Sequence, residues 1–293
     1  MLEARASSFP LQTTILTTMA MLAFAANSLL CRLALQQGEI DPASFAGIRL
    51  ISGAITLAVI VRFRSERSWP GHPDWLAATM LFAYVAFFSF AYLILPAGTG
   101  ALILFGTVQL TMFSVGLRSG EKFGPVAWLG LALAVAGLVY LMSPGVAAPP
   151  LLGAVLMAIA GLAWGVYSLR GRGVADPLAA TASNFAWAAP LAFLLSVVFI
   201  ATGHAHTDKA GFALAIASGA LTSGIGYVIW YAALRKLSAM RAATVQLSVP
   251  LIAAFGGVAL LSEAITPRLT AASAAILGGI ALVLTSKSRM PRT

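Results

Sequence analysis

Long runs of apolar residues dominate the chain, and short polar breaks separate them. Each run is close to the roughly 20 residues that a helix needs to cross the hydrocarbon core of a bilayer. The breaks are rich in Gly, Pro and charged residues, as in 37–39 and 143–150. The pattern predicts ten membrane-spanning helices, at Leu11–Leu35, Pro42–Val61, Trp75–Leu95, Ala101–Leu117, Val126–Met142, Leu151–Leu169, Pro177–Ala201, Gly211–Leu234, Ala242–Leu261 and Leu269–Thr285.

Continuous apolar runs favour an all-α integral membrane protein over a β-barrel, because barrel strands alternate apolar and polar residues. Composition supports this class: 60% of the residues are hydrophobic and 9% are charged, against about 25% charged in soluble domains. The run Ala23-Phe24-Ala25 is similar to a signal-peptidase site, but the apolar stretch continues past it. We therefore expect this stretch to remain as the first span.

The formal net charge of +9 indicates membrane orientation rather than nucleic-acid binding, because the basic residues collect on one side of the predicted spans. Only Lys209 and Arg268 fall on the other side, while Arg32 and Arg49 lie within spans. The asymmetry predicts a multi-pass protein of a bacterial cytoplasmic membrane with both termini in the cytoplasm. The side predicted to be cytoplasmic carries Arg5, Arg62, Arg64, Arg67, Arg118, Lys122, Arg170, Arg172, Arg235, Lys236, Arg241, Lys287, Arg289 and Arg292.

An internal repeat divides the chain into halves of five spans each. The segment 120–125, with Glu121 and a closing proline, recurs at 262–267 around Glu263, and Asp-Pro pairs precede the second and seventh spans. Because five is odd, the second copy begins on the opposite side of the membrane. The repeat predicts two inverted five-helix units, 1–148 and 149–293, around a central cavity, an arrangement found in secondary transporters.

These features together resemble the EamA family of the drug/metabolite transporter superfamily, over essentially the whole chain. Within it, the sequence is most similar to the bacterial aromatic amino-acid exporters of the YddG type. The resemblance implies a basket of helices around a cavity, alternating access, and export of amino acids and amphipathic drugs. One position departs from the pattern: members usually have a tryptophan in span one where this chain has Ala26, and only its counterpart Trp164 is present.

Burying an unpaired amide in lipid is costly, so amide side chains within the predicted spans are candidate polar contacts. We single out Asn27 in span one, Gln109 in span four and Gln246 in span nine. Each could contact a substrate or form a hydrogen bond between helices. Gln109 lies closest to the midplane, so we expect it to be the main polar contact for a substrate.

Aromatic residues form faces on corresponding helices of the two halves. Tyr84 and Phe88 are four residues apart on span three, and Tyr227 and Tyr231 repeat this spacing on span eight. Trp164 and Trp187 could stack on a flat substrate. Such faces could also serve only for packing. With the three amides, these residues form the predicted substrate-binding set: Asn27, Tyr84, Phe88, Gln109, Trp164, Trp187, Tyr227, Tyr231 and Gln246.

Acidic residues within the spans and nucleotide-binding motifs would indicate how transport is driven. No Asp or Glu lies at the centre of a predicted span, and no phosphate-binding G-x-x-x-x-G-K-[ST] loop is found. We therefore expect facilitated diffusion rather than proton-driven or ATP-driven transport. Arg32 is expected to extend its charge to the membrane surface. Arg49 could do the same or bind a substrate carboxylate.

The sequence thus predicts a secondary transporter that exports small amphipathic metabolites, aromatic or hydrophobic amino acids foremost, by alternating access. Its partners would be the small-molecule substrate and the lipid bilayer, with no nucleic acid, cofactor, metal or obligate protein partner. Sugars or phosphorylated metabolites are alternative cargo. A membrane-embedded enzyme would need His, Asp or Glu clustered at one membrane face, whereas His72 and the pair His204 and His206 fall in loops on opposite sides. A metal at His204, His206 and Asp208 is the remaining alternative.

Overall fold

The computed structural model describes residues 11–64, 73–145, 148–171, 174–237 and 239–286. Within these ranges ten helical spans are long and apolar enough to cross a membrane, which confirms the predicted fold class. The segments are α1 Leu11–Gln36, α2 Pro42–Arg62, α3 Trp75–Tyr92, α4 Ala97–Arg118, α5 Pro125–Met142, α6 Leu151–Arg170, α7 Pro177–Ala201, α8 Lys209–Ile216, the π-helix η1 Ala217–Ile225, α9 Gly226–Leu234, α10 Ala239–Gln246, α11 Ser248–Leu261 and α12 Pro267–Thr285.

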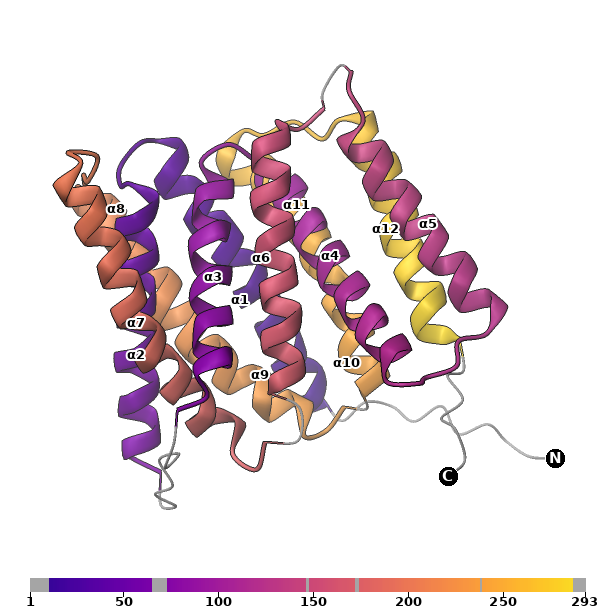
Figure 1. Ribbon diagram of the computed structural model, residues 1–293, viewed down its shortest axis with the longest axis horizontal. Coiled ribbons are helices and arrows are strands. Elements are labelled where there is room, and N and C mark those ends of the chain that lie inside the picture. Colours follow the sequence, from indigo (N-terminus) through magenta and orange to yellow (C-terminus); the bar gives the residue numbers. More distant parts are fainter. Residues whose placement is uncertain (1–10, 65–72, 146–147, 172–173, 238, 287–293) are drawn as a thin grey trace.

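The helices pair across the two halves of the chain, as inverted repeats require (Figure 1). The second span packs on the seventh (α2 on α7), the fourth on the ninth (α4 on α11) and the fifth on the tenth (α5 on α12). The third span packs on the sixth (α3 on α6), and correspondingly the first packs on the eighth (α1 on α8, η1 and α9). The interior of the bundle is therefore built from both halves.

Matching residues shape matching helix ends in the two halves. Asp41 caps α2 by accepting hydrogen bonds from the N–H groups of Ala43 and Ser44, and Asp176 caps α7 in the same way. Gly120 and Ser262, which precede the two repeated glutamates, both adopt positive φ, at 83° and 55°. A left-handed residue is favourable for glycine but costs energy for serine.

The two ends of the bundle are named here by the acidic residues that lie there. The Glu263 end contains the connections α1–α2, α3–α4, α5–α6, α7–α8 and α11–α12, and it is uppermost in Figure 1. The Asp176 end contains the connections α2–α3, α4–α5, α6–α7 and α9–α10. Because the number of spans is even, the chain enters α1 and leaves α12 at the Asp176 end.

Span four begins at Ala97, four residues before the predicted start at Ala101. Pro96 occupies the N-cap, where its missing N–H is tolerated. The N–H of Ala97, which has no acceptor within its own helix, donates to the Glu263 carboxylate at 2.8 Å. A partner distant in sequence therefore completes this helix start, which local sequence patterns do not reveal.

Spans eight and nine are irregular, while their counterparts α3 and α4 are regular α-helices. Span eight contains η1, and π-helical turns are frequent at functional sites. Span nine breaks at Leu247, three residues before Pro250. Proline has no backbone N–H, so it removes one hydrogen bond of the helix. The sequence has Val108 at the position of span four that matches Pro250, and α4 is correspondingly unbroken. Broken helices near the membrane centre are common around transporter binding sites.

Candidate substrate cavity

A cavity lies at the centre of the bundle, between the two halves. Eight helical segments contribute to it: α1, α2, α3 and α4 from the first half, and α6, η1, α9 and α10 from the second. Its lining combines aromatic rings, small polar groups and one full charge. The lining residues are Phe24, Asn27, Ser28, Arg49, Tyr84, Phe88, Leu104, Phe105, Trp164, Thr222, Ser223, Tyr227 and Gln246.

Aromatic rings from three helices form one wall of the cavity. The rings of Trp164 and Tyr227 are nearly parallel, at an angle of 13° with centroids 5.7 Å apart. The Tyr84 ring also packs against Trp164, with centroids 4.8 Å apart, and the Phe88 ring lies 5.3 Å from that of Tyr84. Close packing of α6 on α4 places Trp164 here, because a Cβ on Gly161 would come within 2.8 Å of the Leu104 carbonyl oxygen. The wall offers flat apolar surfaces suited to ring stacking.

A chain of hydrogen bonds forms the polar side of the cavity. Ser218 and Thr222 donate to the Asn27 side-chain oxygen at 2.7 and 3.2 Å, and the Asn27 amide donates to the Tyr84 hydroxyl at 3.4 Å. The Tyr84 hydroxyl also accepts from Arg49 at 3.1 Å. The chain thus links α1, α2, α3 and η1, and it holds Tyr84 in a fixed orientation.

Arg49 is the full charge in this lining. It lies on α2, eight residues after the capping Asp41, and its side chain is 1% exposed. Its guanidinium carbon lies over the rings of Tyr84 and Phe88, at 5.2 and 5.0 Å from their centroids. The side chain therefore turns into the cavity and does not extend to the membrane surface. Of the two possibilities left open by the sequence, the structure therefore excludes extension of the Arg49 charge to the membrane surface.

The cavity is contracted. About 30 Å³ is free, enough for about two water molecules. An amino acid would therefore fit only after the two halves move apart. Since the lining comes from both halves, such a movement would widen the site between them.

The structure brings six of the nine predicted binding residues together in the lining: Asn27, Tyr84, Phe88, Trp164, Tyr227 and Gln246. The other three lie elsewhere. Gln109 is half-buried on α4, beyond the part of that helix that lines the cavity. Trp187 is 38% exposed on α7 and packs against Trp75 with ring centroids 4.6 Å apart. The Tyr231 hydroxyl lies 2.8 Å from that of Thr181, toward the Asp176 end.

Sequence reasoning did not select several lining residues: Phe24, Ser28, Leu104, Phe105, Thr222 and Ser223. Small polar and aliphatic residues are common on every face of a membrane helix, so they give no signal of their own. Thr222 and Ser223 lie within η1, where the change of helical period shifts the side-chain direction. An isolated arginine within a span was a usable signal for Arg49.

One ion pair joins the two halves at the Glu263 end. Arg32 Nε lies 3.1 Å from Glu263, and the two side chains are 13% and 10% exposed. Arg32 also donates to the carbonyl oxygens of Tyr92 and Leu93, at 2.9 and 3.2 Å. The prediction that Arg32 extends to the membrane surface is therefore wrong, because a carboxylate from the other half and two free helix-end carbonyls hold it in place.

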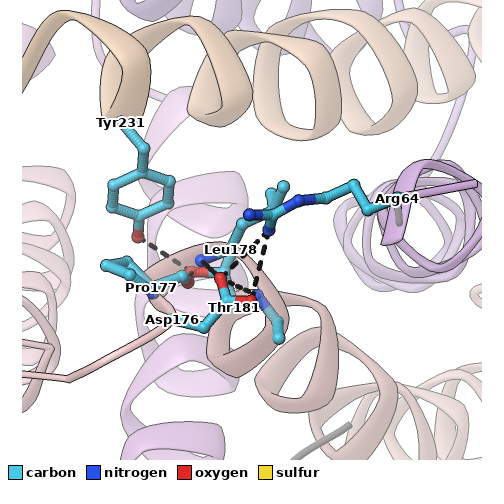
Figure 2. A network of polar contacts seen from close by, with 7 residues as sticks. Arg64, Asp176, Pro177, Leu178, Thr181 and Tyr231 are labelled. Carbon is cyan, nitrogen blue, oxygen red and sulfur yellow. Dashed lines mark hydrogen bonds and ion pairs between the residues drawn. The ribbon is translucent and has the colours of Figure 1, made fainter. Parts of the chain in front are cut away.

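Two ion pairs join the halves at the Asp176 end, and both are more exposed. Figure 2 shows Arg64, which follows α2, paired with Asp176 at 3.1 Å, and Tyr231 bonded to Thr181 beside this pair. The second pair joins Arg170, at the end of α6, to Asp74 at 2.8 Å, with side chains 48% and 35% exposed. Water screens such pairs.

The carboxyls of Asp74 and Asp176 lie outside the spans, and both have lowered pKa values. Partial burial acts to raise the pKa of Asp176, but the Ala179 N–H and the Arg64 guanidinium outweigh it. For Asp74, burial is likewise outweighed by the Ala77 N–H and by Arg170, so the pKa falls below its usual value. Both carboxyls are therefore ionised at neutral pH.

The histidines predicted as alternative metal ligands serve the loop between α7 and α8. The backbone N–H of His206 donates to Asp41 at 3.1 Å, and Asp208 caps α8 through the Gly211 N–H at 2.7 Å. Within the described residues no group of three His, Cys, Asp or Glu side chains could hold a metal ion. His72 lies outside the described residues.

Ten spans in two inverted halves around a central cavity define a membrane transporter of the inverted-repeat class. The EamA-like transporter family model matches residues 12–143 and again 151–285. The chain therefore belongs to the EamA-like transporter family. The two matches fall within the predicted units 1–148 and 149–293, whose boundary stays a prediction.

Relatives from bacteria and archaea share most of the chain. An uncharacterised protein of Pseudomonas aeruginosa is 53% identical over 273 residues, covering 93% of this chain and 94% of its own. An uncharacterised transporter of Archaeoglobus fulgidus is 28% identical over 271 residues, covering 86% and 90%. One crystal structure aligns with a TM-score of 0.64 at 19% identity, over 92% of this chain and 96% of that chain. That likeness shows the shared fold.

Proposed function

We propose that this transporter exports flat amphipathic metabolites, aromatic amino acids foremost, from the cytoplasm by alternating access. The observation that carries the proposal is the aromatic wall of the cavity. Trp164 and Tyr227 already stack on each other at 5.7 Å, and a planar substrate ring could take the place of one partner when the cavity widens. Each such ring pair contributes about 0.5–1.5 kcal/mol beyond the burial of its area.

The ion pairs between the halves support alternating access. Among the described residues, one pair lies at the Glu263 end and two lie at the Asp176 end, so ion pairs hold the two halves together at each end. We call the ion pairs at one end its closure. A substrate in the cavity would leave when one closure opens while the other holds. The charge asymmetry of the loops predicts that the Asp176 end faces the cytoplasm.

The positions of the acidic residues support facilitated diffusion. Each described carboxylate lies between helices and not within a span, from Glu39 after α1 to Glu263 after α11. A proton-coupled carrier usually has a carboxylate within the membrane. The substrate gradient would then drive export without ion coupling.

Transport measurements in liposomes test the proposal. Purified protein without ATP or ion gradients should exchange radiolabelled phenylalanine or tryptophan across the membrane. Trp164→Ala should weaken apparent affinity about threefold to tenfold, because it removes one stacking surface. Trp75→Ala is the matched control, since Trp75 is 56% exposed at the start of α3 and outside the cavity. Exchange of sugars but not aromatic amino acids would overturn the proposal, and flux only with an imposed gradient would overturn its uncoupled mechanism.

Labelling in intact cells tests the orientation. Ser119→Cys and Ser262→Cys lie beside the repeated glutamates at opposite ends of the bundle. An impermeant thiol reagent added outside should label the cysteine at 262 and spare that at 119. The reverse pattern would place the Asp176 end outside and make the proposed direction wrong. The natural Cys31 is buried, so the parent protein serves as the background control.

A further inference from the structure

Arg49 has donor capacity that the protein does not use. Its Nε donates to the Ser223 hydroxyl at 3.3 Å and its Nη2 to the Tyr84 hydroxyl at 3.1 Å. Its Nη1 is fully buried and has no hydrogen-bond partner. Buried polar groups in native proteins are nearly always paired, so an orphaned guanidinium nitrogen in a cavity wall indicates a missing ligand.

The charge of Arg49 also lacks a counter-charge among the described residues. Three other arginines, Arg32, Arg64 and Arg170, take part in the ion pairs of those residues. The groups around Arg49 are neutral: two hydroxyls and the rings of Tyr84 and Phe88. A cation inside the membrane without a partner is costly and marks a pathway for substrate or ion.

The backbone around Arg49 is built to keep the side chain inside the cavity. A Cβ on Gly219 of η1 would lie 2.2 Å from the Arg49 carbonyl oxygen, so glycine allows η1 to touch α2 at this residue. The π-helical turn then presents Ser223 to the guanidinium. Two aromatic rings and a serine fix the guanidinium, and Nη1 is left without a partner in a side chain that lines the cavity.

We propose that Arg49 binds the carboxylate of the substrate, with Nη1 as the principal donor. This inference rests on the proposed function and narrows it to amphipathic monocarboxylates. The Tyr84 hydroxyl accepts two hydrogen bonds and so retains its own O–H as a second donor to the same carboxylate. The substrate ring then lies against Trp164, whose centroid is 4.8 Å from that of Tyr84. Arg49 is the one cation in the lining, which suits a monoanion better than a phosphate dianion.

Exchange assays that compare phenylalanine with phenylalaninamide test this site, because the two differ in carboxylate charge and share the ring. Wild-type protein should prefer phenylalanine. Arg49→Met should weaken its apparent affinity about tenfold to hundredfold, as for lost hydrogen bonds to a charged group. The apparent affinity of Arg49→Met for phenylalaninamide should stay within about threefold of the wild-type value. Retained transport of this compound would also show that the variant folds. The apparent affinity of Arg49→Lys for phenylalanine should lie between those of wild type and Arg49→Met, because lysine keeps the charge and loses the planar geometry.

Arg118→Met is the matched control, because Arg118 is exposed in the last turn of α4. It should leave both substrates unchanged. Equal loss of both substrates in Arg49→Met, or equal wild-type affinity for both, would overturn the carboxylate site while the proposed function stands. If wild-type protein transports neither compound, the proposed function fails and the inference fails with it.

Discussion

The two ends of the cavity are closed by related residues in different arrangements. At the Glu263 end, the glutamate bonds both Arg32 and the Ala97 N–H at the start of α4. The repeat places Arg170, Glu121 and Ala239 at the corresponding positions, and α10 does begin at Ala239. There, however, Arg170 pairs with Asp74 and not with Glu121. Among the described residues, the matching arginine and glutamate are therefore paired at the Glu263 end and not at the Asp176 end.

Under the proposed alternating access, the structure would represent one of two states related by the inverted repeat. The assembled contact of Glu263 with Arg32 and Ala97 is nearly buried and links α1, α4 and the loop after α11, so it closes the Glu263 end firmly. The pairs at the Asp176 end are more exposed than this contact, so we expect them to contribute less. In the opposite state we expect Glu121 to take Arg170 and the Ala239 N–H, while Glu263 releases Arg32.

The largest expected effect comes from breaking the assembled contact. Glu263→Gln removes the charge that compensates Arg32 in a site only 10–13% exposed. Breaking one side of a buried pair costs roughly 3–5 kcal/mol, and we expect the lower part of this range. Thermal unfolding in detergent should show a clear loss of stability. The double variant with Arg32→Gln should recover part of it, since the two residues are coupled.

Glu121→Gln is the matched control for this prediction, because it makes the same change at the counterpart of Glu263. Its effect on the unfolding temperature should be small, since Arg170 keeps its partner Asp74. Equal destabilisation by Glu121→Gln and Glu263→Gln would mean that the two ends are alike in solution. The comparison on which the account rests would then be wrong.

A smaller effect is expected from the exposed closure. Asp176→Asn removes the pair with Arg64 but keeps an oxygen that can cap α7. Exposed pairs contribute about 0–1 kcal/mol, so the unfolding temperature should change little. Labelling of Ser28→Cys, introduced in the cavity wall, should become faster from the Asp176 end. Faster labelling from the Glu263 end instead would contradict the assignment of the weaker closure.

The sequence was sufficient for the ten spans because each is set locally by its apolar length, and two of them also by the Asp-Pro helix starts at 41–42 and 176–177. It could not show which side of each helix faces inward. Tyr231 follows the aromatic spacing of Tyr227, and Trp187 was expected to stack on a substrate. In the structure Tyr231 bonds Thr181 and Trp187 packs on Trp75. Rotation of a membrane helix depends on its neighbours.

Long-range partners explain the remaining differences. Nothing near Arg32 in the sequence reveals Glu263, 231 residues away. The inward direction of Arg49 depends on Gly219 and Ser223 in a π-helical turn, and no periodic pattern signals that turn. The repeat itself offered one usable signal. Matching Arg32 with Arg170, and Glu263 with Glu121, singles out the ion pair of the Glu263 end and Arg170 of the Asp176 end, although Arg170 pairs with Asp74 and not with Glu121.

The smallest expected effect concerns pH. Because the pKa values of Asp74 and Asp176 are lowered in the folded protein, their pairs add stability above the unfolded pKa near 4 and lose it as pH falls through the folded values. Labelling of Ser28→Cys from the Asp176 end should therefore be constant between about pH 5 and 8, after correction for thiol ionisation. A change in accessibility within this range would contradict the lowered pKa values.

Reversible cross-linking of the two counterpart contacts tests the central claim most directly. Cysteine pairs replace Arg32 and Glu263 in one variant, and Arg170 and Glu121 in another, each joined by a cleavable thiol cross-linker in liposomes. We predict that both pairs cross-link, that each cross-link stops phenylalanine exchange, and that reduction restores it. Exchange that continues with either pair fully cross-linked would contradict alternating access between the two closures.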